Sequence, residues 1–446
     1  MEPTVTTNTP APVTSNKKVH RAWSMYDWAN STYNLVITTT FFPVYYNAVT
    51  STEHYPKGVP FMGRYFVNTA LKDYSLALAY LIIAFLSPIL SSIADYKGNK
   101  KRFMQFFCYL GSLSCCGMYF FKESRIAIGI VCFILAAIGY CGSLVFYNSY
   151  LPEIALEEEQ DKVSAQGFAY GYIGSVLLQL IGFGLVSLWP EKHSAEPVLI
   201  TFLLVGLWWM GFAQITFKHL PKTQSLQTDK KRNVLTAGFK ELRKVWKQLR
   251  ELPVLKLYLV AFFLYSIGVQ TVMLVAVDFG DKVLKLEATK LIITVVVIQL
   301  VAIIGAWMMS RLSAIFGNLK VLIGVVVMWM LICIYGYYLQ TEMQFYIIAS
   351  AVGLVMGGIQ SLSRSTYSKL MPPTHDTASF FSFYDVTEKI AIVVGMFSFG
   401  FIEEITGSMR NSVLTLIGFF AAGALLLYLA INKNSKEKLN FATSNL

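Results

Sequence analysis

Charge is scarce in this sequence of 446 residues: Asp, Glu, Lys and Arg together make up 14% of it, against about 25% in a soluble globular domain. Histidine and cysteine are also rare, with five and six residues. All six cysteines lie inside apolar runs, and none has metal-ligand spacing with a histidine. The sequence therefore argues against a large soluble domain, a disulfide framework and a metal centre, and we expect no cofactor.

Motifs of several functional classes are also missing. There is no Walker-type phosphate loop, no HExxH, no Cys–His cluster and no GxSxG. There is neither a selectivity-filter sequence nor an Arg-rich voltage-sensor helix. These absences argue against an ATP-driven pump, an intramembrane hydrolase and a channel, so we do not expect an enzyme.

Long apolar runs are abundant instead, and 55% of the residues are hydrophobic. A membrane-spanning helix needs about 20 predominantly apolar residues. Twelve candidate spans recur from end to end, at 23–48, 73–93, 104–121, 126–148, 165–188, 198–217, 256–277, 289–310, 319–339, 343–363, 378–402 and 411–431. We therefore predict an all-α, multi-pass integral membrane protein with twelve transmembrane helices.

The basic residues predict how the chain is oriented. The net charge of +11 is compatible with nucleic-acid binding, but the Lys and Arg residues gather in the short connections between apolar runs. With the N-terminus inside, 26 of them flank the spans on the inner side and 10 on the outer side, while Lys389 lies within a span. Inner loops of membrane proteins carry this excess. We therefore expect both termini to be cytoplasmic and no nucleic-acid partner.

Composition and spacing divide the chain into five segments. Residues 1–20 are rich in Thr and Pro and are expected to be a disordered cytoplasmic tail. Two six-helix bundles at 21–217 and 256–432 follow, joined by a linker at 218–255, and a cytoplasmic tail at 433–446 ends the chain. In the linker, Phe239, Leu242, Val245, Trp246 and Leu249 recur at helical spacing among Lys and Arg. This pattern predicts an amphipathic helix on the cytoplasmic membrane surface.

The two predicted bundles echo each other in sequence. Ser91, Gly98-Asn99 and Lys101 recur as Ser310, Gly317-Asn318 and Lys320 at an offset of 219, and Tyr147 and Pro152 recur as Tyr367 and Pro372 at an offset of 220. The matches fall after the second and fourth spans of each half. They indicate a six-plus-six duplication, hence two pseudo-symmetric bundles with a site at their interface.

The segment SSIADYKGNKKR, residues 91–102, resembles the cytoplasmic signature of the major facilitator superfamily, with Asp95, Gly98 and Arg102 at its characteristic places. Gly98 permits a tight turn, and Asp95 can accept hydrogen bonds from basic groups or a helix N-terminus. We expect these residues to gate or latch the two halves; an ordinary basic turn is the alternative. Ala314 matches Asp95 in the second copy, so any latch there is asymmetric.

Six further segments carry a closer resemblance: YDWANSTY at 26–33, FYNSYLPEIA at 146–155, VSAQGFAYGYIG at 163–174, FFLYSIGVQT at 262–271, GGIQSLSRS at 357–365 and FFSFYDVTEK at 380–389. Together they resemble the branch of that superfamily containing the fungal autophagy-related vacuolar amino-acid effluxers and their bacterial relatives. The resemblance implies a transporter, with amino-acid efflux known from fungal members. The short loops resemble the bacterial branch and imply a bacterial inner membrane. Ile267 departs from the family, whose members often have an acid there.

Polar groups inside a bilayer are costly, about 2.5–3.5 kcal/mol for a charge at a helix centre, and face a cavity or a partner. In the first span, Asp27, Asn30, Ser31, Asn34 and Thr38 form one stripe. We expect Asn30 and Asn34 to bind the solute and Asp27 to bind a proton or a cationic group. A hydrogen-bonded seam between helices is the alternative.

The eleventh span holds Asp385, Glu388 and Lys389, roughly 16 Å into the membrane for Lys389. Asp385 and Lys389 are four residues apart and can pair. Two acids beside one amine have coupled protonation, which favours proton binding during transport. Lys389 can instead hold a solute carboxylate, or the group can be a structural pair. We expect Asp27 and Asp385 to lie at similar depth.

Four other polar positions complete the candidate site. Gln270 and Gln360 are unusual in lipid, and Tyr147 and Asn148 share a region of the fourth span that suits a cavity wall or, for Tyr147, an interfacial belt. Arg364 is expected to form a gate by bridging to Glu157–Glu159; attracting an anionic group is the alternative. The pairs Gly167-Gly171 and Gly353-Gly357 predict close helix packing.

These features predict a secondary transporter that moves a small polar solute, an amino acid being one candidate, by alternating access. Proton coupling is one option. We expect a monomer whose other partners are membrane lipids. Two alternatives remain at this point: a solute sensor that does not transport and signals through 218–255, and an exporter of lipids or drugs.

Overall fold

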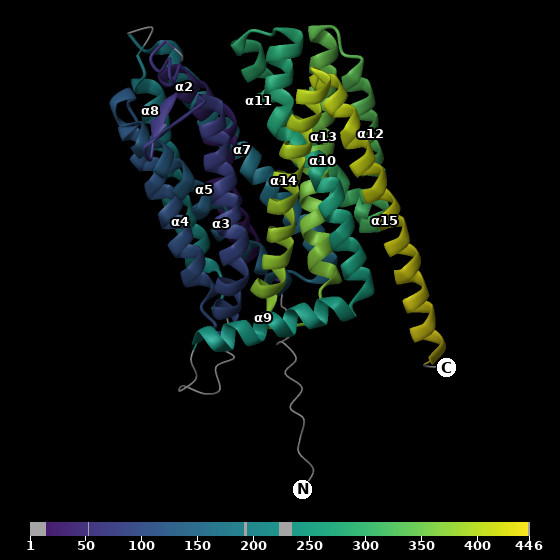
Figure 1. The fold of residues 1–446 in the computed structure, drawn as a ribbon. Coiled ribbons are helices and arrows are strands. Elements are labelled where there is room, and N and C mark those ends of the chain that lie inside the picture. The colour runs from purple at the N-terminus through teal and green to yellow at the C-terminus, as the bar shows by residue number, and fades with distance from the viewer. Residues whose placement is uncertain (1–14, 52, 191–193, 223–233, 445–446) are drawn as a thin grey trace.

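The computed structural model describes residues 15–51, 53–190, 194–222 and 234–444, and these are almost entirely α-helical (Figure 1). The predicted N-terminal tail lies largely outside the described residues, as does part of the linker. The described part contains one small sheet, an antiparallel hairpin of β1 (Val59–Phe61) and β2 (Arg64–Phe66).

Twelve helical segments make up the two halves. In the first half they are α1 (Lys17–Thr32) continued by the π-helix η1 (Tyr33–Phe41) and α2 (Phe42–Val49), then α3 (Asn68–Lys97), α4 (Lys100–Gly117), α5 (Ile126–Ser149), α7 (Gln160–Leu188) and α8 (Glu196–His219). In the second half they are α10 (Pro253–Leu284), α11 (Ala288–Phe316), α12 (Asn318–Tyr337), α13 (Glu342–Leu370), α14 (Thr377–Thr406) and α15 (Met409–Ser444). The remaining elements are short turns at Met118–Phe120, Glu123–Arg125 and Glu157–Glu159, the short helix α6 (Leu151–Ile154), and α9 (Val234–Glu251) between the halves.

Each predicted span overlaps one of these helical segments, and several helices extend beyond the predicted ends, most of all α15, which continues to Ser444 where the span was predicted to end at 431. Among the described residues, ten helices are long and apolar enough to cross a membrane. The two other predicted spans, α1–η1–α2 and α14, are the ones that carry the polar stripe of Asp27 and the charged group of Asp385. Their polarity is thus concentrated where the sequence places the candidate site.

The two halves pack as separate bundles, each with its own hydrophobic core. They stand side by side in Figure 1, purple to blue and green to yellow. They meet along α7 with α11 and α13, and along α14 with α3 and α5. The helix α9 lies across one end of the molecule, which we call the α9 end, and packs on α3, α14 and α10. The duplication predicted from sequence therefore appears as two bundles with an extended interface.

Glycine brings helices into close contact at two related places. A Cβ atom on Gly171 of α7 would collide with the Ser31 side chain of α1, and one on Gly357 of α13 would collide with the Ala302 carbonyl of α11. This confirms the close packing predicted from both small-residue pairs.

Candidate functional site

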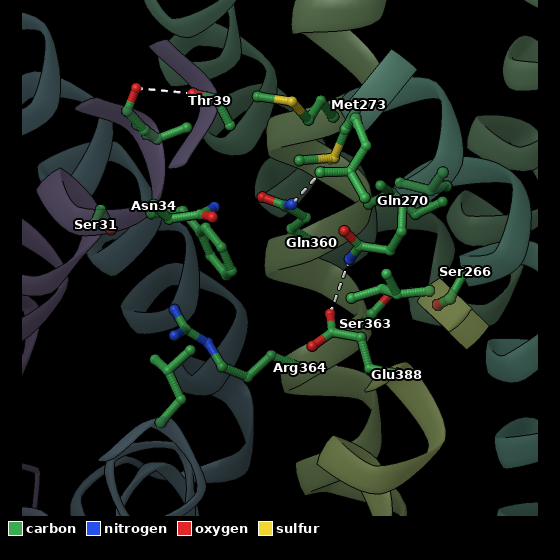
Figure 2. A pocket seen from close by; sticks show the side chains of 18 of the residues that line it. Ser31, Asn34, Thr39, Ser266, Gln270, Met273, Gln360, Ser363, Arg364 and Glu388 are labelled. Atoms are coloured by element: carbon green, nitrogen blue, oxygen red, sulfur yellow. Dashed lines mark hydrogen bonds between the residues drawn. The ribbon is translucent and has the colours of Figure 1, made fainter. Parts of the chain in front are cut away.

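A cavity of about 190 Å³ lies between the two halves. It is lined by α1, η1, α3, α5 and α7 from one half and by α10, α11, α13 and α14 from the other. Eight of the predicted site residues line it: Asp27, Asn34, Asn148, Gln270, Gln360, Arg364, Glu388 and Lys389. Figure 2 shows Arg364 and Glu388 reaching into this space from α13 and α14, with Asn34 facing them from η1. The rest of the wall is largely apolar, including Phe262, Met273 and Met356.

A buried ion pair connects the halves beside the cavity. Arg364 Nη1 and Nη2 lie 3.1 and 3.2 Å from Asp27 Oδ2, and Arg364 Nη1 donates to Asn148 Oδ1 at 3.2 Å. Arg364 Nε donates to Ser164 Oγ at 2.9 Å. Tyr147 donates its hydroxyl to Asp27 Oδ2 at 2.8 Å. The predicted bridge from Arg364 to Glu157–Glu159 is wrong, because the guanidinium is buried against α1 and α7 and reaches Asp27 instead.

Aromatic rings fix the guanidinium of Arg364 in place. It lies 4.3 Å from the Phe168 ring centroid and 4.7 Å from that of Trp23. The Trp23 ring stacks on Tyr147 at 4.3 Å. Cation–π contacts of this kind strengthen when water is excluded, so the charge of Arg364 is held with little freedom to move.

The charged group on α14 is compact. Lys389 Nζ lies 2.8 Å from Glu388 Oε2 and 3.4 Å from Asp385 Oδ1. Gln270 Nε2 donates to Glu388 Oε1 at 3.0 Å. The second oxygen of Asp385, Oδ2, is buried with no hydrogen-bond partner among the described residues. The geometric pairing of Asp385 with Lys389 expected from their spacing is present, and one ammonium serves two carboxylates.

Three predicted site residues lie beside the cavity rather than on its wall. Tyr147 and Asp385 are buried behind Asp27 and Lys389, to which they bond. Asn30 is fully buried, and both ends of its amide lack partners among the described residues. It stands at the edge of the α1 stripe, so Asp27, Ser31 and Asn34 face the cavity while Asn30 turns away.

The π-helix η1 was not predicted from the sequence, and it contains the last two residues of the polar stripe, Asn34 and Thr38. Its Leu35 carbonyl accepts hydrogen bonds from Thr40 Oγ1 at 2.9 Å and from Gln179 Nε2 at 3.4 Å. Gln179 Oε1 in turn accepts from Gln299 Nε2 at 3.1 Å, which joins α7 to α11 across the interface. Short π-helical segments are frequent at functional sites. The run Thr38-Thr39-Thr40 and a lone Gln in an apolar helix are the signals that point to this region.

At the α9 end, the predicted signature connects α3 of the first half to α14 of the second, and we call this contact the first latch. Asp95, near the end of α3, accepts from the backbone N–H groups of Ala378 and Ser379 at 3.3 and 2.7 Å, and from the Ser379 hydroxyl at 2.7 Å. A carboxylate at a helix N-terminus is stabilised by the helix dipole, as the sequence led us to expect. Gly98 ends α3 in the left-handed conformation with φ +63°, whereas Arg102 is exposed on α4.

A second latch occupies the equivalent place in the other half. Asp161, at the start of α7, accepts from Ser313 Oγ at 2.8 Å, from Asn318 Nδ2 at 2.7 Å and from Lys369 Nζ at 2.7 Å. Ala314 supplies no acid, as the sequence implied, and the facing helix supplies one instead. Asp161 was not among the predicted gating residues, since its partners lie more than 150 positions away.

This arrangement of two bundles around a central polar cavity is that of a major facilitator superfamily transporter. The structure resembles the E. coli fucose:proton symporter FucP, with a TM-score of 0.67 at 15% identity over 93% of this chain and 97% of that one. It also resembles the proton:xylose symporter XylE, with a TM-score of 0.70 at 11% identity over 92% of this chain and 94% of that one. These likenesses concern the fold alone.

Sequence comparison then identifies the family. The profile described as "Vacuole effluxer Atg22 like" matches residues 15–440, and the chain belongs to this family. It is 32% identical to the uncharacterized MFS-type transporter YxiO of Bacillus subtilis, over 94% of this chain and 96% of that protein. It is 26% identical to autophagy-related protein 22 of Kluyveromyces lactis, over 86% of this chain and 84% of that one. The resemblance drawn from sequence is confirmed, and the protein is a multi-pass membrane transporter.

Proposed function

We propose that this protein carries a small zwitterionic solute, best represented by an amino acid, across a bacterial plasma membrane by alternating access. The observation that carries the proposal is that Arg364 and Glu388 both line the same cavity. A guanidinium is the protein group best suited to bind a carboxylate through paired hydrogen bonds. Glu388 offers a carboxylate for the ammonium of the same solute.

The size and lining of the cavity support a small solute. Its volume of about 190 Å³ is below the 300–1,000 Å³ typical of drug-sized ligands. The apolar wall formed by Phe262, Met273 and Met356 suits an uncharged side chain. An exporter of lipids or large drugs would need a larger cavity with fewer charges.

The proposed cycle opens the α9 end by rocking residues 21–217 against 256–432, with 218–255 as the linker. The excess of Lys and Arg beside the inner connections supports a cytoplasmic location for this end and for both termini. Opening it separates Arg364 from Asp27 and breaks both latches. Each chain contains a complete cavity, which supports a monomer as the transporting unit.

The group on α14 supports proton coupling. One ammonium between two carboxylates leaves a net negative charge in a setting with little water, and such a charge is costly. A proton taken up by Asp385 removes that cost and leaves Glu388 charged for the ammonium of the solute. We propose that this protonation accompanies solute movement.

The decisive test is solute selection by the purified protein in liposomes. Uptake of a labelled apolar amino acid is challenged with the unlabelled amino acid, its amide, which lacks the carboxylate, and its 2-oxo acid, which lacks the ammonium. Only the intact amino acid should compete well. The exposed residue Lys57 supplies a control variant, Lys57→Gln, which should transport normally. Equal competition by all three compounds contradicts a zwitterion site, and absence of transport for a broad amino-acid pool contradicts the proposed solute class.

A further inference from the structure

The exposed face of α9 takes no part in the cavity. Val245 and Leu249 of this helix are buried against the bundle. The opposite side carries five exposed basic residues at helical spacing: Lys240, Arg243, Lys244, Lys247 and Arg250. The α9 sequence contains only two acids, Glu241 and Glu251. Lys247 lies 4.0 Å from Glu251 in an exposed pair, and the other four basic residues leave the face with a net positive charge.

Aromatic rings flank the basic face. Trp246 is 48% exposed and Phe239 is 55% exposed, and the basic side chains together with Trp246 line a shallow groove along the helix. The Trp246 ring also contacts Phe383 of α14, with centroids 5.6 Å apart. Helices at the headgroup level of a membrane combine these features, because basic groups pair with phosphates while aromatic rings enter the boundary with the acyl chains.

The position of α9 gives this face a mechanical connection to the gate. The helix lies across the spans in Figure 1 and packs on α3 of one half and on α14 and α10 of the other. Lys244 Nζ bonds Asp376 Oδ2 at 2.8 Å, directly before α14 begins. The first N–H groups of α14 hold Asp95 in the first latch. Whatever holds α9 in place therefore also supports that latch.

We propose that the basic–aromatic face of α9, formed by Lys240, Arg243, Trp246, Lys247 and Arg250, binds the phosphate headgroups of anionic phospholipids. Bound lipid holds α9 across both halves and stabilises closure of the α9 end. Clusters of basic residues on amphipathic helices are attracted to anionic membrane surfaces, at about a fivefold gain in affinity for each residue near the surface. The lipid thus acts as a brake on the opening of this end.

The test compares the full-length protein with two charge-matched variants. Lys240→Gln, Arg243→Gln and Lys247→Gln are combined in one variant, which leaves the Lys244–Asp376 bond intact. The control combines Lys57→Gln, Arg64→Gln and Arg125→Gln, which are exposed and lie on connections at the opposite end. Binding of phosphatidylglycerol against phosphatidylcholine is measured by native mass spectrometry in a neutral detergent. Wild type and control should prefer phosphatidylglycerol, and the α9 variant should lose at least about tenfold of that preference.

A second measurement tests the brake. Amide hydrogen exchange at the start of α14, which includes Ala378 and Ser379, is followed in nanodiscs with and without phosphatidylglycerol. The anionic lipid should slow exchange in wild type and control but not in the α9 variant. Equal phosphatidylglycerol binding by the α9 variant and wild type, or displacement of the lipid by millimolar inorganic phosphate, overturns the lipid assignment. If phosphatidylglycerol does not change the exchange rate at the start of α14 in wild type, the proposal that bound lipid stabilises closure of the α9 end is wrong.

Discussion

The two buried charge groups at the cavity differ in how far apart their members lie in the chain. Arg364 and Asp27 are 337 positions apart and belong to different halves. Lys389, Glu388 and Asp385 lie within one turn of α14. Relative movement of the halves must separate the first group, whereas the second can persist throughout. The pair of Arg364 and Asp27 therefore depends on the conformation of the transporter, whereas the α14 group can change its protonation without movement of the halves.

The largest expected effect follows from breaking the first group. Arg364→Ala leaves the Asp27 carboxylate buried without its cation, which costs about 3–5 kcal/mol. We expect a lower midpoint of thermal unfolding in detergent and complete loss of uptake in liposomes. Adding Asp27→Asn should restore much of the unfolding midpoint, because the unpaired charge is gone, but not the uptake. Uptake by Arg364→Ala within twofold of wild type would show that Arg364 has no role at the site.

The second expected effect concerns the α14 group and changes only the coupling of solute movement to the pH gradient. Asp385→Asn removes one of the two carboxylates beside Lys389, so a proton is no longer needed to balance the charge. We expect accumulation driven by a pH gradient to fall at least about tenfold, while exchange of labelled for unlabelled solute without a gradient continues. Ser114→Ala, on α4 away from the cavity, is the control and should leave both measurements unchanged. Parallel loss of accumulation and exchange would instead make Asp385 a structural partner of Lys389.

A third effect compares the latches. Asp161 bonds an ammonium as well as two neutral donors, whereas Asp95 bonds two N–H groups and a hydroxyl. Both acceptors are carboxylates, but a bond in which the donor is also charged is stronger than one from a neutral donor, and only Asp161 bonds the ammonium of Lys369 in this set. We expect Asp161→Asn to open the α9 end more than Asp95→Asn.

Access at the α9 end can be measured by alkylation of a cysteine placed at Ser361, which is buried between the halves, in a background without the six native cysteines. Faster alkylation of Asp161→Asn than of Asp95→Asn is the expected order. The reverse order would mean that the helix N-terminus, not the ion pair, dominates closure.

The smallest effect is expected at Gln270. Gln270→Leu removes one hydrogen bond to Glu388 without changing the charge of the α14 group. A single bond of this kind contributes about 1.5–3 kcal/mol at most, and less where water can replace it. We expect a rise in the KM for solute of roughly fivefold with little change in the maximal rate. An unchanged KM would show that Glu388 needs no orientation by Gln270.

The features that could be predicted from the sequence are those that depend on residues close together in the chain. The spacing of Asp385 and Lys389 fixes their contact, because residues four apart share a helix face. The spans, the amphipathic α9 and the Gly98 turn are also local patterns. The partner of Arg364 depends on how α13 lies against α1, which no local pattern contains. The position of Arg364 at the edge of its span favours the Glu157–Glu159 loop, and that prediction is wrong.

The position of Asn30 and the π-helix η1 were also not predicted, each for a physical reason. Asn30 belongs to the stripe by helical spacing. The cavity, however, contacts only part of the stripe, and Asn30 lies outside that part. The π-helix η1 changes the number of residues in a turn, so positions after Tyr33 no longer follow the period assumed for the stripe. Thr38, which is buried without a partner among the described residues, shows the consequence.

In three of the contacts that join the halves, the acceptor is a carboxylate of the first half and the donor belongs to the second. Asp27, Asp95 and Asp161 all belong to the first half, and their main donors, Arg364, the start of α14 and Lys369, all belong to the second. Two copies of the first half would oppose carboxylates at these contacts, and two copies of the second would oppose donors. The two halves are therefore complementary at these contacts: expressed as separate chains, they should bind each other and not their own copies.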